Sequence, residues 1–185
     1  MSSSAAQVFP TLQDDKVPDR SRPLLDKVKK SFGFIPNLFA AFSNSPVLLE
    51  GYLGLDATYS KGTLSPIERQ LVLLTASVVN ECPYCTAAHS TVAKGMLKVP
   101  AAVVAAVRAQ QPVPDTKLNA LVNLTREVVQ GRGHVSPATI QSFLNAGFHR
   151  DQIGEVLVGV ALKTMSNYTH HLSPVEIDPA FKSEA

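Results

Sequence analysis

Residues 80–89 read NECPYCTAAH and hold both cysteines of this 185-residue chain, Cys82 and Cys85, with His89 four residues after the second. The stretch follows a long apolar run at 71–79. Pro83 has a fixed φ and no N–H, which suits the first turn of a helix. We therefore expect a helix that begins at Pro83, with Cys82 near its N-cap and Cys85 near its third position.

The start of such a helix favours a thiolate at Cys85. Free amide N–H groups and the positive end of the helix dipole lower the pKa of a thiol from about 8.5 to about 3.5–7.5. His89 lies one turn beyond Cys85 on the same face, where it can accept the thiol proton or hold the thiolate by a hydrogen bond. Residues three apart on a helix are close enough to form a disulfide, so Cys82 can resolve an oxidised Cys85. The pattern indicates a redox dithiol.

Other interpretations of the cysteine pair stay open at this point. The pair could be buried without chemistry, because cysteine also serves as a small hydrophobe. It could be half of a zinc site, although the sequence has no second CxxC and no HxxxH to complete it. It could form a static disulfide, but the loop would be tiny and would constrain the unfolded chain little. Our interpretation needs no metal or other cofactor beyond the cysteine pair.

Composition limits the class of partner. The chain is 45% hydrophobic and 17% charged with a net charge of +2, which is typical of a soluble globular protein whose apolar share often includes an oligomer interface. Three basic residues, Lys27, Lys29 and Lys30, are expected to form a solvated helix face, and we expect no nucleic-acid partner. No apolar run reaches the roughly 18 residues of a membrane span, and residues 1–6 lack a secretory signal. We expect a cytoplasmic protein, whose dithiol is kept reduced.

Proline, glycine and capping residues predict an all-α fold of about eight helices in one compact bundle, with no reliable strand. We expect an N-terminal arm at 1–20, a helical domain at 21–172 and a tail at 173–185. The helix that begins at Ser65-Pro66 carries the N-terminal signature of a cap, a proline and an acid, Glu68. It is apolar on nearly every face through Val79, so we expect it to be buried. The expected helices span 23–33, a short segment after 36, 46–59, 66–79, 83–97, 100–111, 115–130, 137–145 and 151–170.

The segment from Ser65 to His89 resembles the carboxymuconolactone decarboxylase and alkylhydroperoxidase D superfamily. Residues 35–39 (IPNLF) and 163–168 (KTMSNY) resemble segments of its peroxidase-related branch, so that the resemblance covers roughly 33–181. It implies an all-helical fold of the alkylhydroperoxidase D type that assembles as trimers or hexamers. By this analogy Cys85 would be the peroxidatic cysteine, Cys82 the resolving cysteine and His89 part of a proton relay. Decarboxylase members usually lack the cysteine pair, which argues against lactone decarboxylation.

The function expected on these grounds is a thiol-dependent peroxidase that reduces hydroperoxides through Cys82 and Cys85. The resemblance implies that a lipoylated or thioredoxin-like dithiol protein supplies the electrons. Two alternatives remain open. One is a general thiol–disulfide oxidoreductase. The other is a redox-sensing or small-ligand-binding protein with no turnover.

The proton relay is where the sequence departs from the family. Alkylhydroperoxidase D has a glutamate twelve residues before the first cysteine, and this chain has Gln70 there, which cannot carry a proton as a carboxylate does. We expect Glu68 to supply the missing carboxylate, provided that the cysteine helix folds back antiparallel to the helix before it. Glu81 is the other nearby acid, and a simple capping role is the alternative for Glu68. His170, beside His171, is a further residue that could border the site.

Overall fold

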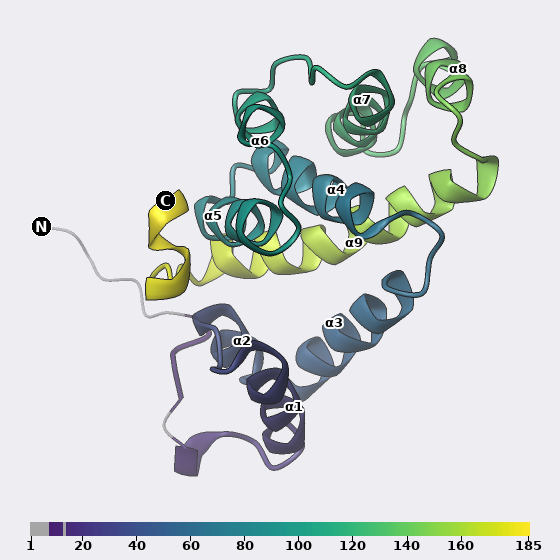
Figure 1. The fold of residues 1–185 in the computed structure, drawn as a ribbon. Coiled ribbons are helices and arrows are strands. Elements are labelled where there is room, and N and C mark those ends of the chain that lie inside the picture. Colours follow the sequence, from purple (N-terminus) through teal and green to yellow (C-terminus); the bar gives the residue numbers. More distant parts are fainter. Residues whose placement is uncertain (1–7, 13) are drawn as a thin grey trace, which may run out of the picture.

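The computed structural model describes residues 8–12 and 14–185, and within these residues it contains helices and no strands (Figure 1). The all-α prediction is therefore confirmed. The helices are η1 (Asp14–Lys16), α1 (Arg22–Phe32), α2 (Asn37–Phe42), α3 (Pro46–Tyr59), α4 (Pro66–Val79), α5 (Pro83–Thr91), η2 (Val92–Met96), α6 (Ala101–Arg108), α7 (Thr116–Gln130), α8 (Pro137–Asn145), α9 (Arg150–Leu172) and η3 (Pro179–Glu184).

Helix α4 lies at the centre of the fold, packed against α5, α6, α7 and α9 (Figure 1). Its start forms the expected capping box: Glu68 N–H donates to Ser65 Oγ over 3.2 Å, and Ser65 N–H donates to Glu68 Oε2 over 2.7 Å. Its apolar side chains are almost fully enclosed, as the sequence predicts for a helix without a polar face. A rigid central helix therefore underlies the helix that carries the cysteines.

A close helix approach sets the position of α9. The Cα of Gly159 faces Tyr59 of α3 and Val72 of α4 so closely that an added Cβ would lie 2.8 Å from atoms of each side chain. The missing side chain lets α9 lie against both helices, and Tyr59 is fixed in turn by a hydrogen bond from its hydroxyl to the Arg69 carbonyl. One turn beyond Gly159, this contact directs Lys163 into the interior.

The helix expected at 83–97 is shorter than predicted. Helix α5 ends at Thr91, and the chain continues as a single π-helical turn, η2, closed by the Leu97 N–H on the Val92 carbonyl. Such wide turns occur mostly as local insertions in α-helices and often lie near functional sites. Gly95 in this turn weakens the regular helix, and the turn carries Lys94 towards the C-terminal residues.

The expected tail is an ordered part of the domain, which we call the C-terminal strap (residues 173–185). Its short helix η3 packs along α5, and the buried Phe181 ring meets Tyr84 edge-on. The Tyr84 hydroxyl donates to the buried Asp178 carboxylate over 2.5 Å, and the Asn37 N–H donates to the same carboxylate. The strap thus joins the cysteine helix to the start of α2.

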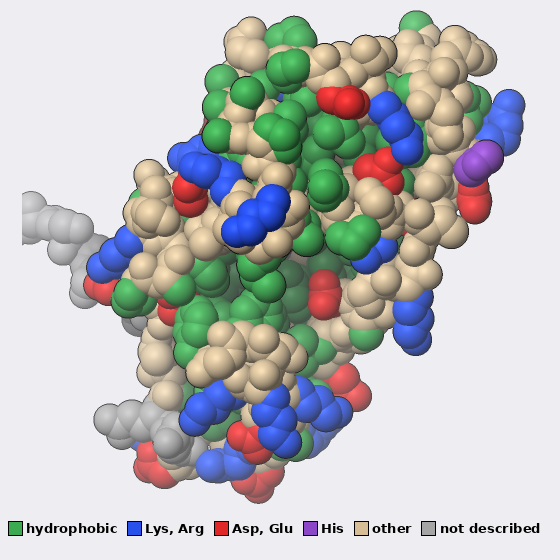
Figure 2. All heavy atoms as spheres, in the orientation of Figure 1, with side chains coloured by type: hydrophobic (Ala, Val, Ile, Leu, Met, Phe, Trp, Pro, Cys, Tyr) green, Lys and Arg blue, Asp and Glu red, His purple; other side chains and the backbone are tan. Residues whose placement is uncertain are grey.

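One face of the molecule has a hollow lined by hydrophobic side chains, between the part that holds α1–α3 and the part that holds α4–α9 (Figure 2). Exposed apolar side chains on α9, Leu157, Tyr168 and Leu172, add to the apolar surface of the monomer. None of the helices that the structure describes is both long and apolar enough to cross a membrane.

Candidate active site

The two cysteines lie where the helix α5 begins. Cys82 is the N-cap residue in an extended conformation, Pro83 is the first helical residue and Cys85 is the third, as the sequence predicts. Glu81 makes the reversal between α4 and α5 with a left-handed φ of 55°, a conformation that non-glycine residues seldom adopt. Both thiols are free and buried. The N-terminal end of α5 therefore presents the dithiol inside the domain.

The environment of the pair makes the two thiols unequal. A hydrogen bond from Cys82 lowers the pKa of Cys85 well below its ordinary value, against the effect of burial, with further help from the Lys163 charge and from Ser166 and Asn167 of α9. The pKa of Cys82 is raised, because it is the hydrogen-bond donor to Cys85 and because it is buried beside that negative charge. The surroundings thus favour the thiolate form at Cys85 and the protonated form at Cys82.

His89 lies one helical turn beyond Cys85 and is held on both sides of its ring. Its Nδ1 is 2.9 Å from Gln70 Nε2, and its Nε2 is 2.9 Å from Lys163 Nζ. Burial lowers the pKa of His89 well below its ordinary value, and the charge of Lys163 lowers it further. The imidazole is therefore neutral, and each ring nitrogen has one defined partner.

Gln70, and not Glu68, occupies the position beside His89. The Gln70 amide nitrogen also donates to the His89 carbonyl oxygen over 2.8 Å, so the same group holds both the ring and the backbone of this residue. Gln70 near the start of α4 meets His89 near the end of α5, which shows that the two helices run antiparallel, as the relay prediction required.

The structure does not bring Glu68 to His89. Its carboxylate accepts from the Ser65 N–H and forms an ion pair with Lys117 of α7, with 2.8 Å between the charged atoms. The Ser65 and Lys117 partners lower its pKa in spite of partial burial. Glu68 and Gln70 are two residues apart on one helix and so cannot face the same neighbour. The contacts of Glu68 are those of a helix cap, which was the alternative to the relay role expected from the sequence.

Lys163 is the residue that sequence reasoning missed. The residue is 1% exposed, and a lysine buried to this extent is unusual. A signal was present in the sequence: Lys163 lies seven residues after Val156 and seven before His170, so it shares the buried face of α9 with both. The periodicity places a lysine where a hydrophobic residue is expected.

Two further groups from α9 complete the surroundings of the dithiol. Cys85 Sγ lies 3.9 Å from Ser166 Oγ, and Asn167 is positioned by a hydrogen bond from Asn80 Nδ2 to its side-chain oxygen. The phenol of Tyr52 on α3 is buried, which raises its pKa, and the charges of Asp56 and Cys85 raise it further. Neutral hydrogen-bonding groups therefore surround the Cys85 sulfur on the side away from α5.

The two histidines near the end of α9 lie elsewhere. His170 packs its ring against Tyr84, and its Nε2 is 3.3 Å from the Val175 carbonyl oxygen of the C-terminal strap. Burial lowers the pKa of His170, and the nearby Cys85 charge partly opposes this. His171 is exposed and stacks on Tyr168. His170 thus borders the cysteine helix but does not join the contact that links Gln70, His89 and Lys163.

Other proteins resemble this region in sequence and the whole chain in fold. Residues 48–127, which include α4, α5 and the dithiol, match the family model of the carboxymuconolactone decarboxylase family. Over this region, which is less than half of the chain, the protein is similar in sequence to that family. Among curated proteins, no sequence matches the chain.

Solved structures share the fold over nearly the whole length of the chain. An alkylhydroperoxidase AhpD core from Ralstonia eutropha JMP134, a peroxidase-related protein, is 22% identical and superposes with a TM-score of 0.82 over 95% of this chain and 94% of its own. A peroxidase-related protein from Silicibacter sp. TM1040 is 16% identical, with a TM-score of 0.80 over 97% and 94%. The debrominase Bmp8, solved with 2,3,4-tribromopyrrole, is also 16% identical, with a TM-score of 0.80 over 98% and 97%.

Proposed function

We propose that the protein is a thiol-dependent peroxidase that reduces hydroperoxides with the Cys82–Cys85 dithiol. The observation that supports this most is the division of roles within the pair: Cys85 is a buried thiolate at the third position of α5, and Cys82 is a protonated thiol that donates to it. A low-pKa thiolate is the nucleophile that attacks a peroxide, and a neighbouring thiol is what converts the resulting sulfenic acid to a disulfide.

Hydrogen-bond accounting around His89 supports one tautomer of its ring. The Gln70 amide nitrogen donates to the His89 carbonyl, so the group that faces Nδ1 is a donor and Nδ1 accepts. The single proton of the neutral ring then lies on Nε2, on the side of Lys163 Nζ. Gln70 and Lys163 thus hold the ring between α4 and α9, one helical turn beyond Cys85.

We assign to Lys163 the electrostatic stabilisation of the Cys85 thiolate. The positive charge of its ammonium group attracts the thiolate, and this attraction keeps the pKa of Cys85 low. The thiolate then attacks the distal oxygen of the hydroperoxide, the O–O bond breaks, and the ammonium protonates the departing alkoxide. The products are an alcohol, the Cys85 sulfenic acid and the neutral amine.

The second step converts the Cys85 sulfenic acid to a disulfide with Cys82. The Cys82 sulfur attacks the sulfenic sulfur, a Cys82–Cys85 bond forms, and the hydroxyl leaves as water with the Cys82 proton. A dithiol reductant, which we propose to be a lipoylated or thioredoxin-like protein, then supplies two electrons and two protons to regenerate the pair. His89 and Gln70 contribute by holding the position and tautomer of the groups around Lys163.

The same dithiol chemistry could act on other two-electron acceptors. A general thiol–disulfide oxidoreductase would use Cys85 as the attacking thiolate on a protein disulfide. The structural likeness to a debrominase suggests a brominated pyrrole as a third acceptor. A protein that senses redox state without turnover would form the disulfide slowly and only once per reduction.

The test is a comparison of second-order rates for the reduced protein in a stopped-flow instrument, with alkyl hydroperoxides, a low-molecular-weight disulfide and 2,3,4-tribromopyrrole as acceptors. Our proposal requires the hydroperoxides to react fastest, and Cys85→Ser to abolish the reaction. A faster reaction with the disulfide or the bromopyrrole would move the assignment to that chemistry. Rates that are negligible with all three would favour the sensing or binding protein.

We also propose that the chain forms a homo-oligomer, a trimer or hexamer as the superfamily likeness suggests. The apolar hollow between α1–α3 and α4–α9 and the exposed apolar side chains of α9 support this, because a monomer seldom leaves a large apolar patch in water (Figure 2). Sedimentation velocity at micromolar concentration distinguishes the two assemblies from a monomer.

A further inference from the structure

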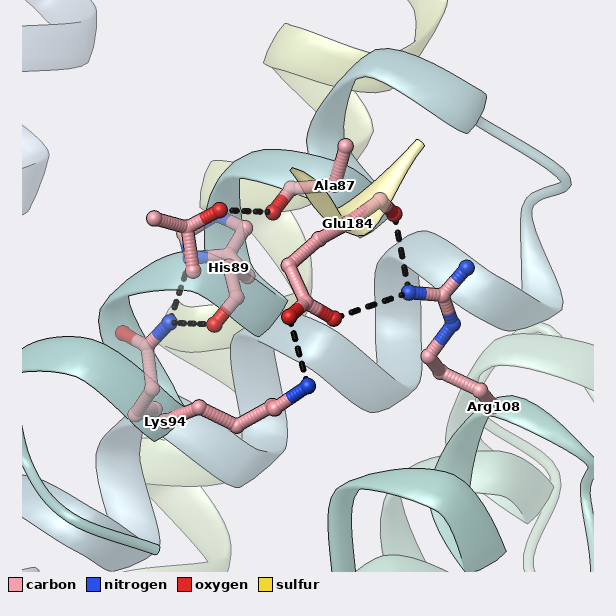
Figure 3. Close-up of polar contacts among 7 residues, drawn as sticks. Ala87, His89, Lys94, Arg108 and Glu184 are labelled. Atoms are coloured by element: carbon pink, nitrogen blue, oxygen red, sulfur yellow. Dashed lines mark hydrogen bonds and ion pairs between the residues drawn. The ribbon is translucent and has the colours of Figure 1, made fainter. Parts of the chain in front are cut away.

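Two cations from different elements meet on one carboxylate beside the cysteine helix. Lys94 Nζ of η2 lies 2.5 Å from Glu184 Oε1, and Arg108 Nη1 at the end of α6 lies 3.4 Å from Glu184 Oε2 (Figure 3). The same Arg108 nitrogen donates to the Glu184 main-chain carbonyl over 2.8 Å. The Glu184 side chain is only 14% exposed, whereas Lys94 and Arg108 are 38% and 33% exposed. The geometry is that of a carboxylate-binding site whose ligand belongs to the chain itself.

Glu184 separates two cavities. One, of about 510 Å³, is lined by Lys94 and by apolar side chains of α6 such as Val104. The other, of about 430 Å³, is lined by Cys82 and Pro83 at the start of α5. Arg108 and Glu184 belong to the lining of both. Withdrawal of the Glu184 side chain would therefore join the cavities into one path from the cation pair to the resolving cysteine.

Only the last turn of the C-terminal strap has to move for this. Asp178 and Phe181 anchor the strap in the interior, whereas Lys182 and Ser183 are exposed. The anchored part can stay in place while the exposed turn with Glu184 opens, because local openings of exposed segments cost much less than global unfolding.

We propose that Lys94 and Arg108 form a carboxylate-binding subsite next to Cys82, that Glu184 fills it in the closed state, and that a thiol reductant bearing a carboxylate takes its place. This inference rests on the proposed function in one respect, namely that the Cys82–Cys85 disulfide has to be reduced again. Glu81 lines the cavity near Cys82 and repels a second negative charge there, so the carboxylate belongs at the Arg108 end and the thiol at the cysteine end.

This orientation lets two thiols of the reductant reduce the Cys82–Cys85 disulfide in two exchange steps. The reductant thiolate attacks Cys82 Sγ, a mixed disulfide forms, and the electron pair of the broken S–S bond leaves with Cys85 as a thiolate. Cys85 is the better leaving group, because a thiol of low pKa departs faster. A second reductant thiol then attacks the mixed disulfide, which releases the external disulfide and returns Cys82 to its thiol with a proton from solvent.

Glu184 acts in this scheme as a tethered competitor. A group held on the same chain competes at an effective concentration in the millimolar range or above, without loss of its own translational freedom. An external carboxylate therefore binds weakly to the wild type and more tightly when Glu184 is replaced by a neutral isostere. The two cations should remain the binding groups in both cases.

A binding experiment on the reduced full chain tests the subsite independently of redox activity. The probe is hexanoate, followed by titration calorimetry, with hexanol as the uncharged control. We expect Glu184→Gln to bind hexanoate at least about tenfold more tightly than the wild type. The double variant Glu184→Gln with Arg108→Gln should lose this gain. No binding to Glu184→Gln, or equal binding to the double variant, would overturn the subsite.

A kinetic experiment tests the assignment to a reductant. The protein is oxidised with diamide, and its reduction by 3-mercaptopropionate is compared with that by neutral 2-mercaptoethanol. We expect the ratio of the two rates to rise several-fold in Glu184→Gln and to fall back in the double variant with Arg108→Gln, and high salt to erase the difference. A ratio that is the same in all variants would overturn the reductant assignment. If diamide forms no disulfide, the proposed redox function fails, and the hexanoate titration still decides the subsite.

Discussion

Gln70→Glu restores a carboxylate at the position where alkylhydroperoxidase D carries one, and it tests the hydrogen-bond accounting around His89. The wild-type amide nitrogen lies 2.9 Å from His89 Nδ1 and donates to the ring. A carboxylate in its place cannot donate, so Nδ1 must carry the proton and Nε2 must accept from Lys163. The substitution is therefore expected to exchange the tautomer of the imidazole.

The magnitude follows from the short distance. Two unit charges about 4 Å apart attract each other by about 4 kcal/mol at an effective dielectric constant of about 20. Burial of the new carboxylate offsets part of this, since Gln70 is only 7% exposed. The net expectation is a rise in the pKa of His89 from its depressed wild-type value, because the new negative charge favours the protonated ring. The substitution should also remove the hydrogen bond to the His89 carbonyl oxygen, because a carboxylate has no N–H to donate.

The assay is nitrogen-15 NMR of the His89 imidazole as a function of pH, which reports tautomer and protonation directly. The wild type should show the Nε2–H tautomer and remain neutral at acidic pH, and Gln70→Glu should show Nδ1–H. A matched control is Gln152→Glu, which adds the same charge to a buried glutamine near the start of α9, about 16 Å along the helix from Lys163. An unchanged His89 spectrum in Gln70→Glu, or a wild-type ring already protonated at Nδ1, would refute the reasoning.

Three further predictions concern the groups around the dithiol. Lys163→Met keeps the buried volume but removes the charge, so the pKa of Cys85 should rise and peroxide reduction near neutral pH should slow at least about tenfold. Rapid kinetics over a pH series would show this, and an unchanged pH profile would exclude the assigned stabilisation of the thiolate. Glu68→Gln should lower the free energy of unfolding by about 0.5–1 kcal/mol, because it weakens the helix cap and the ion pair with Lys117. It should leave the pH dependence of the peroxidase rate unaltered. A shifted pH–rate profile would instead support a role for Glu68 in the proton relay. The folded protein keeps His89 neutral, whereas the unfolded chain binds a proton near pH 6.5, so the free energy of unfolding should fall as the pH drops below about 6.5, by up to about 1.4 kcal/mol per pH unit. Urea unfolding at a series of pH values should show a smaller pH dependence of this free energy in His89→Gln. Equal pH dependence in the two proteins would contradict the burial of a neutral ring.

Local signals in the sequence sufficed for the helix starts and for the placement of the two cysteines at the start of α5. The cap at Ser65 and Glu68 and the proline after Cys82 act through neighbouring residues, so their outcome can be derived without knowing the rest of the fold. The structure also shows the antiparallel return of α5 onto α4, a condition that the sequence left open, through the contact of Gln70 with His89.

The partners of these residues depend on distant segments and could not be derived in the same way. Lys163 reaches His89 only because Gly159 lets α9 approach α3 and α4. No residue close to His89 in the sequence indicates that a lysine 74 positions later will contact it. The choice between Gln70 and Glu68 depends on the rotation of α4 about its axis, which its nearly uniform apolar composition leaves undetermined. The ordered strap likewise depends on the pairing of Tyr84 with Asp178 across 94 positions.

The central claim is that Cys85 is the thiolate that attacks the peroxide and that Cys82 resolves it. The most direct measurement is sulfenic-acid trapping during a single turnover with an alkyl hydroperoxide, with the modified peptide located by mass spectrometry. In Cys82→Ser the account predicts stable trapping at Cys85, because the attacking thiolate remains and the resolving thiol is gone. In Cys85→Ser it predicts no trapping, because Cys82 alone keeps a raised pKa from burial. Trapping at Cys82 in Cys85→Ser, or none in Cys82→Ser while the wild type still consumes peroxide, would contradict the account.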